Sequence, residues 1–284
     1  MALPIARQGR AGGRARVRAE VRPLTSSTPD ALWASRSVRT LKPAAVVCEG
    51  VTRRSRGQHL LDDLTLVVGV GARLLVVSHP EPSASMLLRV LAGLAGMQSG
   101  IVRLAGVARP DSSAAGWARR VGYVGPEAGI YPWMTPREVL ELAGRIAEYD
   151  VADMQRRIDR VSERYGIGVH LDQPIRRGGE PLAQRVALAS AMLTEPEVLL
   201  LDEPLRSVDA EERARLLTIP GRRRTVVLAS RYPASEAGLV NQIAVMRDGH
   251  LVVHTPIGEL EKRGLALSQR GIDALVELAA VEAG

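Results

Sequence analysis

The sequence predicts an α/β protein whose main sheet is mostly parallel. Its strongest signal is residues 198–201, four aliphatic residues without alternation that lead into two carboxylates, Asp202 and Glu203. An unbroken apolar run is typical of a strand that is buried on both faces, as the strands of parallel sheets are. Two similar runs, at residues 74–77 and 225–229, and segments with apolar residues at helical spacing between them favour the same fold class.

Asp202 and Glu203 follow the strand at the end where open α/β sheets bind their ligands. Two carboxylates at this end can hold Mg²⁺ and polarise a water molecule, as phosphoryl transfer requires. The alternative is a core strand followed by a solvated acidic turn, and the surrounding motifs have to decide between the two. We expect the strand itself to be central in the sheet.

The first half of the chain supplies strands at residues 45–48, 61–68, 74–77, 101–104 and 121–124. Gly69 and Gly71 predict a turn before the third of these strands, because glycine tolerates positive φ. Residues 85–94 have the apolar spacing of a helix. From residue 135 to about residue 163 the pattern is again helical, with Thr135 as a cap, Pro136 at the first position and Glu138 at the third.

The second half continues with a helix at residues 182–193 and the two buried strands at 198–201 and 225–229. Residues 243–246 and 250–253 predict a hairpin around Asp248 and Gly249. An amphipathic helix at residues 272–281 closes the chain. No internal repeat is visible, which argues against two tandem copies of one nucleotide-binding unit.

The positive charge is concentrated in residues 1–42, which hold nine Arg or Lys residues against two acidic ones. This excess equals the net charge of +7 for the whole chain, so residues 43–284 carry no net charge. We expect a disordered, Arg-rich arm that contacts anionic lipid or RNA, or that is a dispensable extension. A neutral body is not a basic nucleic-acid-binding domain, so no nucleic-acid partner is expected.

A cytoplasmic location is predicted by three observations. The single cysteine, Cys48, excludes an intramolecular disulfide and fits a reducing compartment. No apolar run approaches the roughly 18 residues of a membrane span, and the N-terminus lacks the apolar core of a secretory signal. The five histidines form no predicted metal cluster. Any work at a membrane would therefore go through a partner.

In order, these segments resemble the ATP-binding subunit of an ABC transporter over roughly residues 44–260. The motifs that carry the resemblance are residues 61–66 (LDDLTL), 87–94 (LLRVLAGL), 99–100 (SG), 121–124 (VGYV), 131–138 (YPWMTPRE), 184–189 (QRVALA), 195–204 (EPEVLLLDEP) and 245–249 (VMRDG). The resemblance implies a P-loop NTPase-type core with a mostly parallel sheet, an antiparallel β subdomain and a helical subdomain at about 127–185. It implies an ATP-binding domain at 43–260 and a C-terminal helical extension at 261–284.

The phosphate loop departs from this family. A working loop has the pattern G-x-x-x-x-G-K-[ST], whose glycines let backbone N–H groups surround the phosphates and whose lysine meets them. Here the matching residues are 78–85, in which serines replace both glycines and Ala84 replaces the lysine. Pro80 and Pro82 lack an N–H, and Glu81 brings a negative charge. The implied phosphate-binding positions are Ser78, Glu81, Ser83, Ala84, Ser85 and Met86.

Other family motifs depart in parallel. The adenine-stacking aromatic falls near Ser55, the glutamine after the strand at 121–124 becomes Pro126, and the switch histidine becomes Arg231. The signature, LSGGQ in the family, falls within residues 176–181 and keeps only its two glycines. The resemblance assigns the remaining roles as follows: Gly178 and Gly179 to the signature, Asp202 and Ser85 to the metal, Glu203 to a residual catalytic role, and Asp209 to catalysis.

The resemblance therefore implies an ABC-type subunit that binds and hydrolyses ATP with Mg²⁺ weakly or not at all. It would be peripheral on the inner face of the cell membrane, bound to an integral-membrane permease through residues 131–138 and the helices after them. It would form a homodimer or a heterodimer with another ATPase subunit. Two alternatives stay open: a soluble regulatory or scaffold protein on the same fold, and an active ATPase with an unconventional loop.

Overall fold

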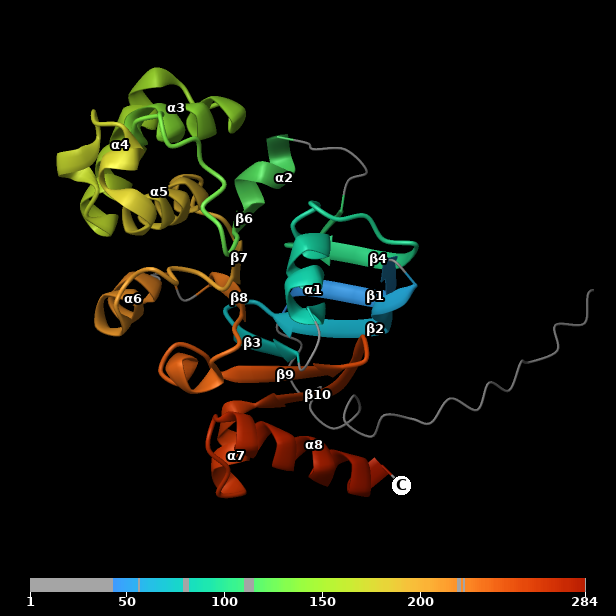
Figure 1. The fold of residues 1–284 in the computed structure, drawn as a ribbon. Helices are drawn as coiled ribbons and strands as arrows, with labels where there is room; N and C mark the ends of the chain where they lie inside the picture. Colours follow the sequence, from blue (N-terminus) through green and yellow to red (C-terminus); the bar gives the residue numbers. More distant parts are fainter. Residues whose placement is uncertain are drawn as a thin grey trace, which may run out of the picture.

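The computed structural model describes residues 43–55, 57–78, 82–109, 115–218, 221 and 223–283. These residues form two β-sheets with helices packed around them (Figure 1). The expected arm, residues 1–42, lies outside the described residues. None of the helices that the structure describes combines the length and the apolar character that a membrane span requires.

The larger sheet has six strands in the order β10-β9-β3-β8-β7-β6. They are β10 (His250–Pro256), β9 (Gln242–Arg247), β3 (Arg73–Ser78), β8 (Thr225–Ala229), β7 (Val198–Asp202) and β6 (Val121–Val124). All neighbours pair in parallel except β9 and β10, which form the expected hairpin. Asp248 and Gly249 both have positive φ in the turn of this hairpin. The predicted mostly parallel sheet is confirmed.

Strand β7 is interior but not central. It lies between β8 and the edge strand β6, whereas β3 and β8 occupy the middle of the sheet, so the expected central position was wrong. All of β7 is nevertheless buried, with Leu199 and Leu201 in one core cluster and Val198 and Leu200 in another. An unbroken apolar run indicates that both faces of a strand are buried. The second strand of a sheet can be buried on both faces as completely as a middle strand, so the run does not predict a central position.

The smaller sheet is antiparallel, with the order β2-β1-β4-β5. Its strands are β2 (Gln58–Gly69), β1 (Ala44–Ser55), β4 (Ser99–Leu104) and β5 (Val107–Ala108). Helix α1 (Ser83–Leu91) buries Leu87, Leu88 and Leu91 in a core that both sheets share (Figure 1). The prediction ended β1 at residue 48, because Gly50 breaks its apolar pattern. The strand continues through a register shift between Cys48 and Val51.

A group of helices lies beyond the β6 edge of the large sheet (Figure 1). The helical pattern at 135–163 resolves into α3 (Pro136–Ile146) and α4 (Val151–Tyr165), and both pack on α5 (Gly179–Leu193). The predicted Thr135 cap is confirmed. Its hydroxyl accepts the Glu138 N–H at 3.2 Å, and the Glu138 carboxylate accepts the Thr135 N–H at 2.9 Å.

Four helices remain, and they differ in how well they were predicted. Helix α8 (Gln269–Ala283) is the predicted C-terminal helix, and it packs against β10 together with α7 (Ile257–Lys262). Helices α2 (Ala115–Arg120), α6 (Ala210–Leu217) and α7 were not predicted. They have six to eight residues each, too few for an apolar spacing to stand out.

Replacing Thr135 with Ala is expected to lower the free energy of unfolding by about 1 kcal/mol, because two N–H groups at the start of α3 lose a reciprocal cap. Urea unfolding followed by circular dichroism measures the change. Thr135→Ser keeps the hydroxyl and should stay close to the parent protein. Equal losses in the two variants would show that the cap does not act through this hydroxyl.

Candidate functional site

The candidate site lies where strands β3, β7, β8 and β6 of the large sheet end. Parallel pairing brings these carboxyl ends to one edge, with Asp202 paired to Ala229 and Val124 paired to Leu201. Helix α1 starts at the same edge, shortly after β3 ends at Ser78. The structure therefore gathers Ser78, the start of α1, the two carboxylates and the switch position in one place.

The start of α1 is capped from within the chain. The Ser78 hydroxyl accepts the backbone N–H of Ala84 at 3.1 Å, although Ser78 stands where the family has a glycine. The methyl group of Ala84 is buried in the core between the sheets, and Met86 is partly buried against the same core. Residues 79–81, and with them the predicted Glu81, lie outside the described residues.

Ser83 is the first residue of α1 and is fully buried. Its hydroxyl has no hydrogen-bond partner in the structure. The preceding Pro82 provides no side-chain cap for the helix. A helix N-terminus favours anions through its free N–H groups, but here the second of these groups is taken by Ser78 and no lysine stands beside it.

Asp202 is the centre of a cluster of hydroxyl groups. Its carboxylate accepts the Ser85 hydroxyl at 2.7 Å and the Tyr123 hydroxyl at 3.2 Å, each on a different oxygen. The side chain is almost wholly buried, so these two donors replace much of its lost hydration. Ser85 and Asp202, which the resemblance assigned to a metal, are thus in direct contact, and Tyr123 is a member of the cluster that sequence reasoning missed.

Tyr123 reaches Asp202 from β6, where it pairs with Leu200 two residues before the carboxylate. Burial, and then the negative charge and hydrogen bond of Asp202, raise the pKa of Tyr123 well above its usual value. Arg89 on α1 opposes this rise. The only feature of the sequence that could have suggested this contact is a tyrosine near the end of a strand. No sequence pattern connects that tyrosine with Asp202.

Glu203 pairs with the residue at the switch position. The Arg231 backbone N–H and the Arg231 Nε–H both donate to Oε1 of Glu203, at 2.8 Å and 3.1 Å. The Glu203 side chain is 10% exposed, whereas the Arg231 side chain is 61% exposed. Glu203 has a positive φ of 48°, and its own N–H donates to the Ala229 carbonyl at 3.0 Å. The structure thus joins two residues that the sequence assigned separately.

A buried ion pair between Arg213 and Glu236 lies next to the contact of Glu203 with Arg231. Arg213 on α6 binds the Glu236 carboxylate through two nitrogens, at 3.1 Å and 2.8 Å, and Glu236 is fully buried. The Ser230 hydroxyl donates to Glu236 at 2.8 Å, and Arg213 Nε donates to the Pro204 carbonyl at 3.0 Å. Sequence reasoning missed this pair, because the partners are 23 residues apart without a motif.

Asp209 and the signature glycines have structural roles of their own. Asp209 caps α6 by accepting the Glu212 N–H at 2.9 Å. Gly178 and Gly179 begin α5, where Gly179 has a positive φ and a Cβ on Gly178 would lie 2.5 Å from Leu182. Among the described residues, no hydrogen bond or ion pair joins either glycine to Asp202 or Glu203.

No other metal site is evident. In the described part of the chain, no group of three or more His, Cys, Asp or Glu side chains is arranged to hold a metal ion. His59 and His250 do meet at the Asp62 carboxylate, at 3.0 Å and 3.5 Å. This contact joins the two sheets and was not visible in the sequence.

Comparison with known proteins identifies the fold family. The sequence pattern of the ABC transporter family matches residues 83–206. Over 218 residues the chain is 32% identical to the Fe(3+) ions import ATP-binding protein FbpC of Streptomyces coelicolor, a match that covers 74% of this chain. Residues 83–206 of this chain match the ABC transporter family, and the chain is similar to ATP-binding proteins of that family. The match spans 62% of FbpC, which is less than two thirds of that relative's length.

Further relatives and solved structures agree. The molybdate/tungstate import ATP-binding protein WtpC of Thermococcus kodakarensis is 28% identical over 77% of this chain and 67% of its own length. The solved structure of an ATP-binding subunit of an ABC transporter superposes with a TM-score of 0.70 at 19% identity, covering 83% of this chain and 99% of the other. A dimeric ATP-binding cassette with ADP and Pi gives 0.66 at 16% identity, over 75% and 98%. These structures support the ABC ATPase fold.

Replacing Tyr123 with Phe should change the alkaline stability of the protein. The folded pKa of Tyr123 lies above the unfolded value of 10.0, so its contribution is complete below pH 10 and is lost as the pH rises through the folded pKa. Tyr165 also has a raised pKa because it is buried. Absorbance titration should therefore show a late phase that shrinks in Tyr123→Phe and shrinks further with Tyr165→Phe added. An unchanged late phase in Tyr123→Phe would contradict the pairing with Asp202.

Proposed function

We propose that this chain is a cytoplasmic ATP-binding-type subunit of an ABC transporter with a degenerate nucleotide site. ATP binding and hydrolysis are then weak or absent. The observation that carries the proposal is the start of α1, where a buried Ala84 replaces the lysine and the Ser78 hydroxyl takes the N–H of Ala84. Both features remove donors from the place where a phosphate would bind.

The residues that would hold Mg²⁺ and the residues that would hold phosphate differ in how well they fit a nucleotide. Asp202 and Ser85 offer oxygen atoms of the kind that Mg²⁺ prefers, and Mg²⁺ would screen the charge of a polyphosphate there. The phosphate half does not fit, because no cation stands at position 84. Losing one buried charge partner costs about 2–5 kcal/mol, which is a factor of about thirty to several thousand in affinity.

The residues assigned to hydrolysis are also engaged elsewhere. Glu203 is held by Arg231, and Asp209 caps α6. Gly178 and Gly179 remain at the start of α5, but Glu180 follows them in the first turn and accepts the Gln184 amide at 3.0 Å. These contacts support a low turnover in addition to weak binding.

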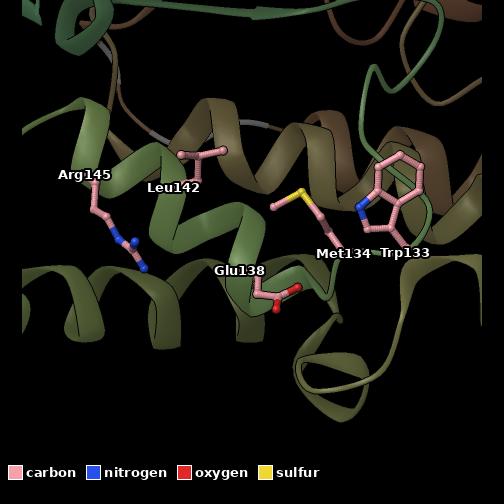
Figure 2. A pocket seen from close by; sticks show the side chains of 5 residues that line it. All are labelled: Trp133, Met134, Glu138, Leu142 and Arg145. Carbon is pink, nitrogen blue, oxygen red and sulfur yellow. The ribbon is translucent and has the colours of Figure 1, made fainter.

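An exposed apolar hollow supports docking to a membrane protein. It has a volume of about 370 Å³ and is lined by Trp133, Met134, Glu138, Leu142 and Arg145. Figure 2 shows Arg145 and Trp133 on opposite sides, with Leu142 and Met134 between them. Tyr131 stacks on Trp133 at 4.7 Å between ring centroids, and both rings are more than half exposed. Exposed apolar surface of this kind marks interaction sites.

We propose that this hollow receives a cytoplasmic segment of an integral-membrane permease. The chain is then peripheral on the inner face of the cell membrane. The opposite charges of Glu138 and Arg145 fit a short segment with an apolar face and polar ends. The hollow lies on α3 and the turn before it, away from the nucleotide loop, so docking and ATP binding can be lost independently.

The proposal includes a homodimer or a heterodimer with another ABC ATPase subunit. In this family each nucleotide sits between the loop of one subunit and the signature of the other. A homodimer of this chain would have two poor sites. A heterodimer with an intact partner would have one site without a loop and one without a complete signature. We place the ATP-binding domain at residues 43–260, its helical subdomain at about 127–185 and a C-terminal extension at 261–284, after an arm at 1–42.

The purified protein is expected to show no ATP binding in the micromolar range by titration calorimetry with Mg²⁺. Its restored-loop variant should bind at least 30-fold more tightly, because glycines and a lysine return donors and charge to the loop. The restored loop combines Ser78→Gly, Pro80→Ala, Pro82→Ala, Ser83→Gly and Ala84→Lys. Micromolar affinity in the unmodified protein would contradict the degenerate site.

Replacing Trp133 with Ala should lower co-purification with membranes about 30-fold, since a buried aromatic anchor is worth about 2 kcal/mol or more at an interface. Cross-linking in intact cells followed by mass spectrometry identifies the partner. Val281→Ala is the control, because Val281 is also exposed and apolar but lies on α8. Absence of any integral-membrane partner would instead favour the soluble scaffold.

A further inference from the structure

Arg231 and Glu203 make a contact that the loss of the phosphate loop does not explain. The loop alone would suffice to weaken ATP binding, yet the carboxylate assigned to hydrolysis is also occupied. Two donors of one residue converge on a single oxygen, Oε1, at 2.8 Å and 3.1 Å. We propose that Arg231 is an internal counter-ion that prevents Glu203 from acting as a base, whether or not a nucleotide is bound. This inference rests on the proposed function, because it concerns the same site.

Strand register brings the two residues together. Glu203 follows β7 and Arg231 comes two residues after β8, and these strands pair in parallel up to Asp202 and Ala229. The N–H of Glu203 then donates to the Ala229 carbonyl, which sets the carboxylate beside the chain leaving β8. The backbone N–H of Arg231 is therefore presented to the carboxylate by the sheet itself.

The buried pair of Arg213 and Glu236 holds both sides of the contact. Arg213 binds the Pro204 carbonyl next to Glu203, and Glu236 accepts from Ser230 next to Arg231. The Ser230 hydroxyl also accepts the Tyr232 N–H at 3.1 Å. Pro204 and Ser230, the chain neighbours of the two contacting residues, therefore both bind the same ion pair. The Glu236 side chain of this pair is 1% exposed. A buried, bidentate pair is far less mobile than a surface pair.

The chemical consequence follows from the donors. A general base has to accept a proton from the attacking water through a free carboxylate lone pair. At Glu203 the oxygen Oε1 already accepts two N–H groups, one of them from a guanidinium, so its lone pairs are engaged. Removing the guanidinium while keeping the backbone N–H should free this oxygen for water.

The test uses the full chain with changes that restore the family pattern in the phosphate loop and the signature. The background carries the restored loop together with Arg177→Ser and Glu180→Gln in the signature. ATP binding is measured by calorimetry and turnover by phosphate release. We expect this background to bind ATP but to turn over at the level of its Glu203→Gln variant. Adding Arg231→His should raise turnover at least tenfold, and Glu203→Gln should then remove the gain.

The control is Arg215→His, which removes another exposed arginine that is paired to a glutamate, Glu212, at 3.4 Å on α6. It should leave turnover unchanged. Full turnover in the background that retains Arg231 would overturn the inference, and so would no gain with Arg231→His. Neither result bears on the proposed function, which is tested separately by ATP binding to the unmodified chain and by the search for an integral-membrane partner.

A second measurement needs no nucleotide and applies if the repaired background does not fold. In the unmodified chain, Arg231→Gln and Glu203→Gln should each lower the thermal midpoint by about 2 °C. The double variant should lose no more than the larger single loss, because both replacements remove one contact. Additive losses would show that the two side chains do not interact and would overturn the inference.

Discussion

Parallel pairing of β6, β7 and β8 is the constraint on which the rest of the site depends. It places Tyr123, Asp202 and the chain after Ala229 at one edge, although they come from three distant parts of the sequence. The apolar faces of β7 fix this arrangement by filling two separate cores. A polar residue in β7 would disturb one of these cores, because successive side chains face opposite sides of the sheet. Packing of the strand therefore sets the position of the carboxylates.

The carboxylates of the site have hydrogen-bond partners within the chain. A buried carboxylate without partners costs several kcal/mol, and Asp202 avoids that cost through hydroxyls of Ser85 and Tyr123. Glu203 does so through Arg231, and Glu236 through Arg213 and Ser230. The N–H of Ala84 is satisfied by Ser78. Hydrogen bonds and ion pairs within the chain therefore hold these groups in position.

Local sequence patterns predicted strands and a helix cap, but they did not predict contacts between side chains that are distant in the sequence. Unbroken apolar runs predicted β3, β7 and β8, and the Thr135 cap predicted the start of α3. The loop residues Ser78 and Ser85 were located by their spacing. The partners Tyr123 and Asp202 are 79 residues apart, and no spacing rule connects such positions. The hollow at Trp133 was similarly invisible, because exposure of an apolar side chain depends on the packing of its neighbours.

The hollow and the signature are connected through the backbone. The N–H of Ile175 donates to the Met134 carbonyl and the N–H of Arg176 to the Pro132 carbonyl, each at 2.9 Å. Two residues later Gly178 opens α5, whose Gln184 accepts the Ser207 N–H close to Asp209. A partner bound at Trp133 would therefore act on the signature helix and on the segment after Glu203 through hydrogen bonds alone. Under the proposed function, this connection would link a partner at Trp133 to the start of α5 by a route that does not pass through the phosphate loop.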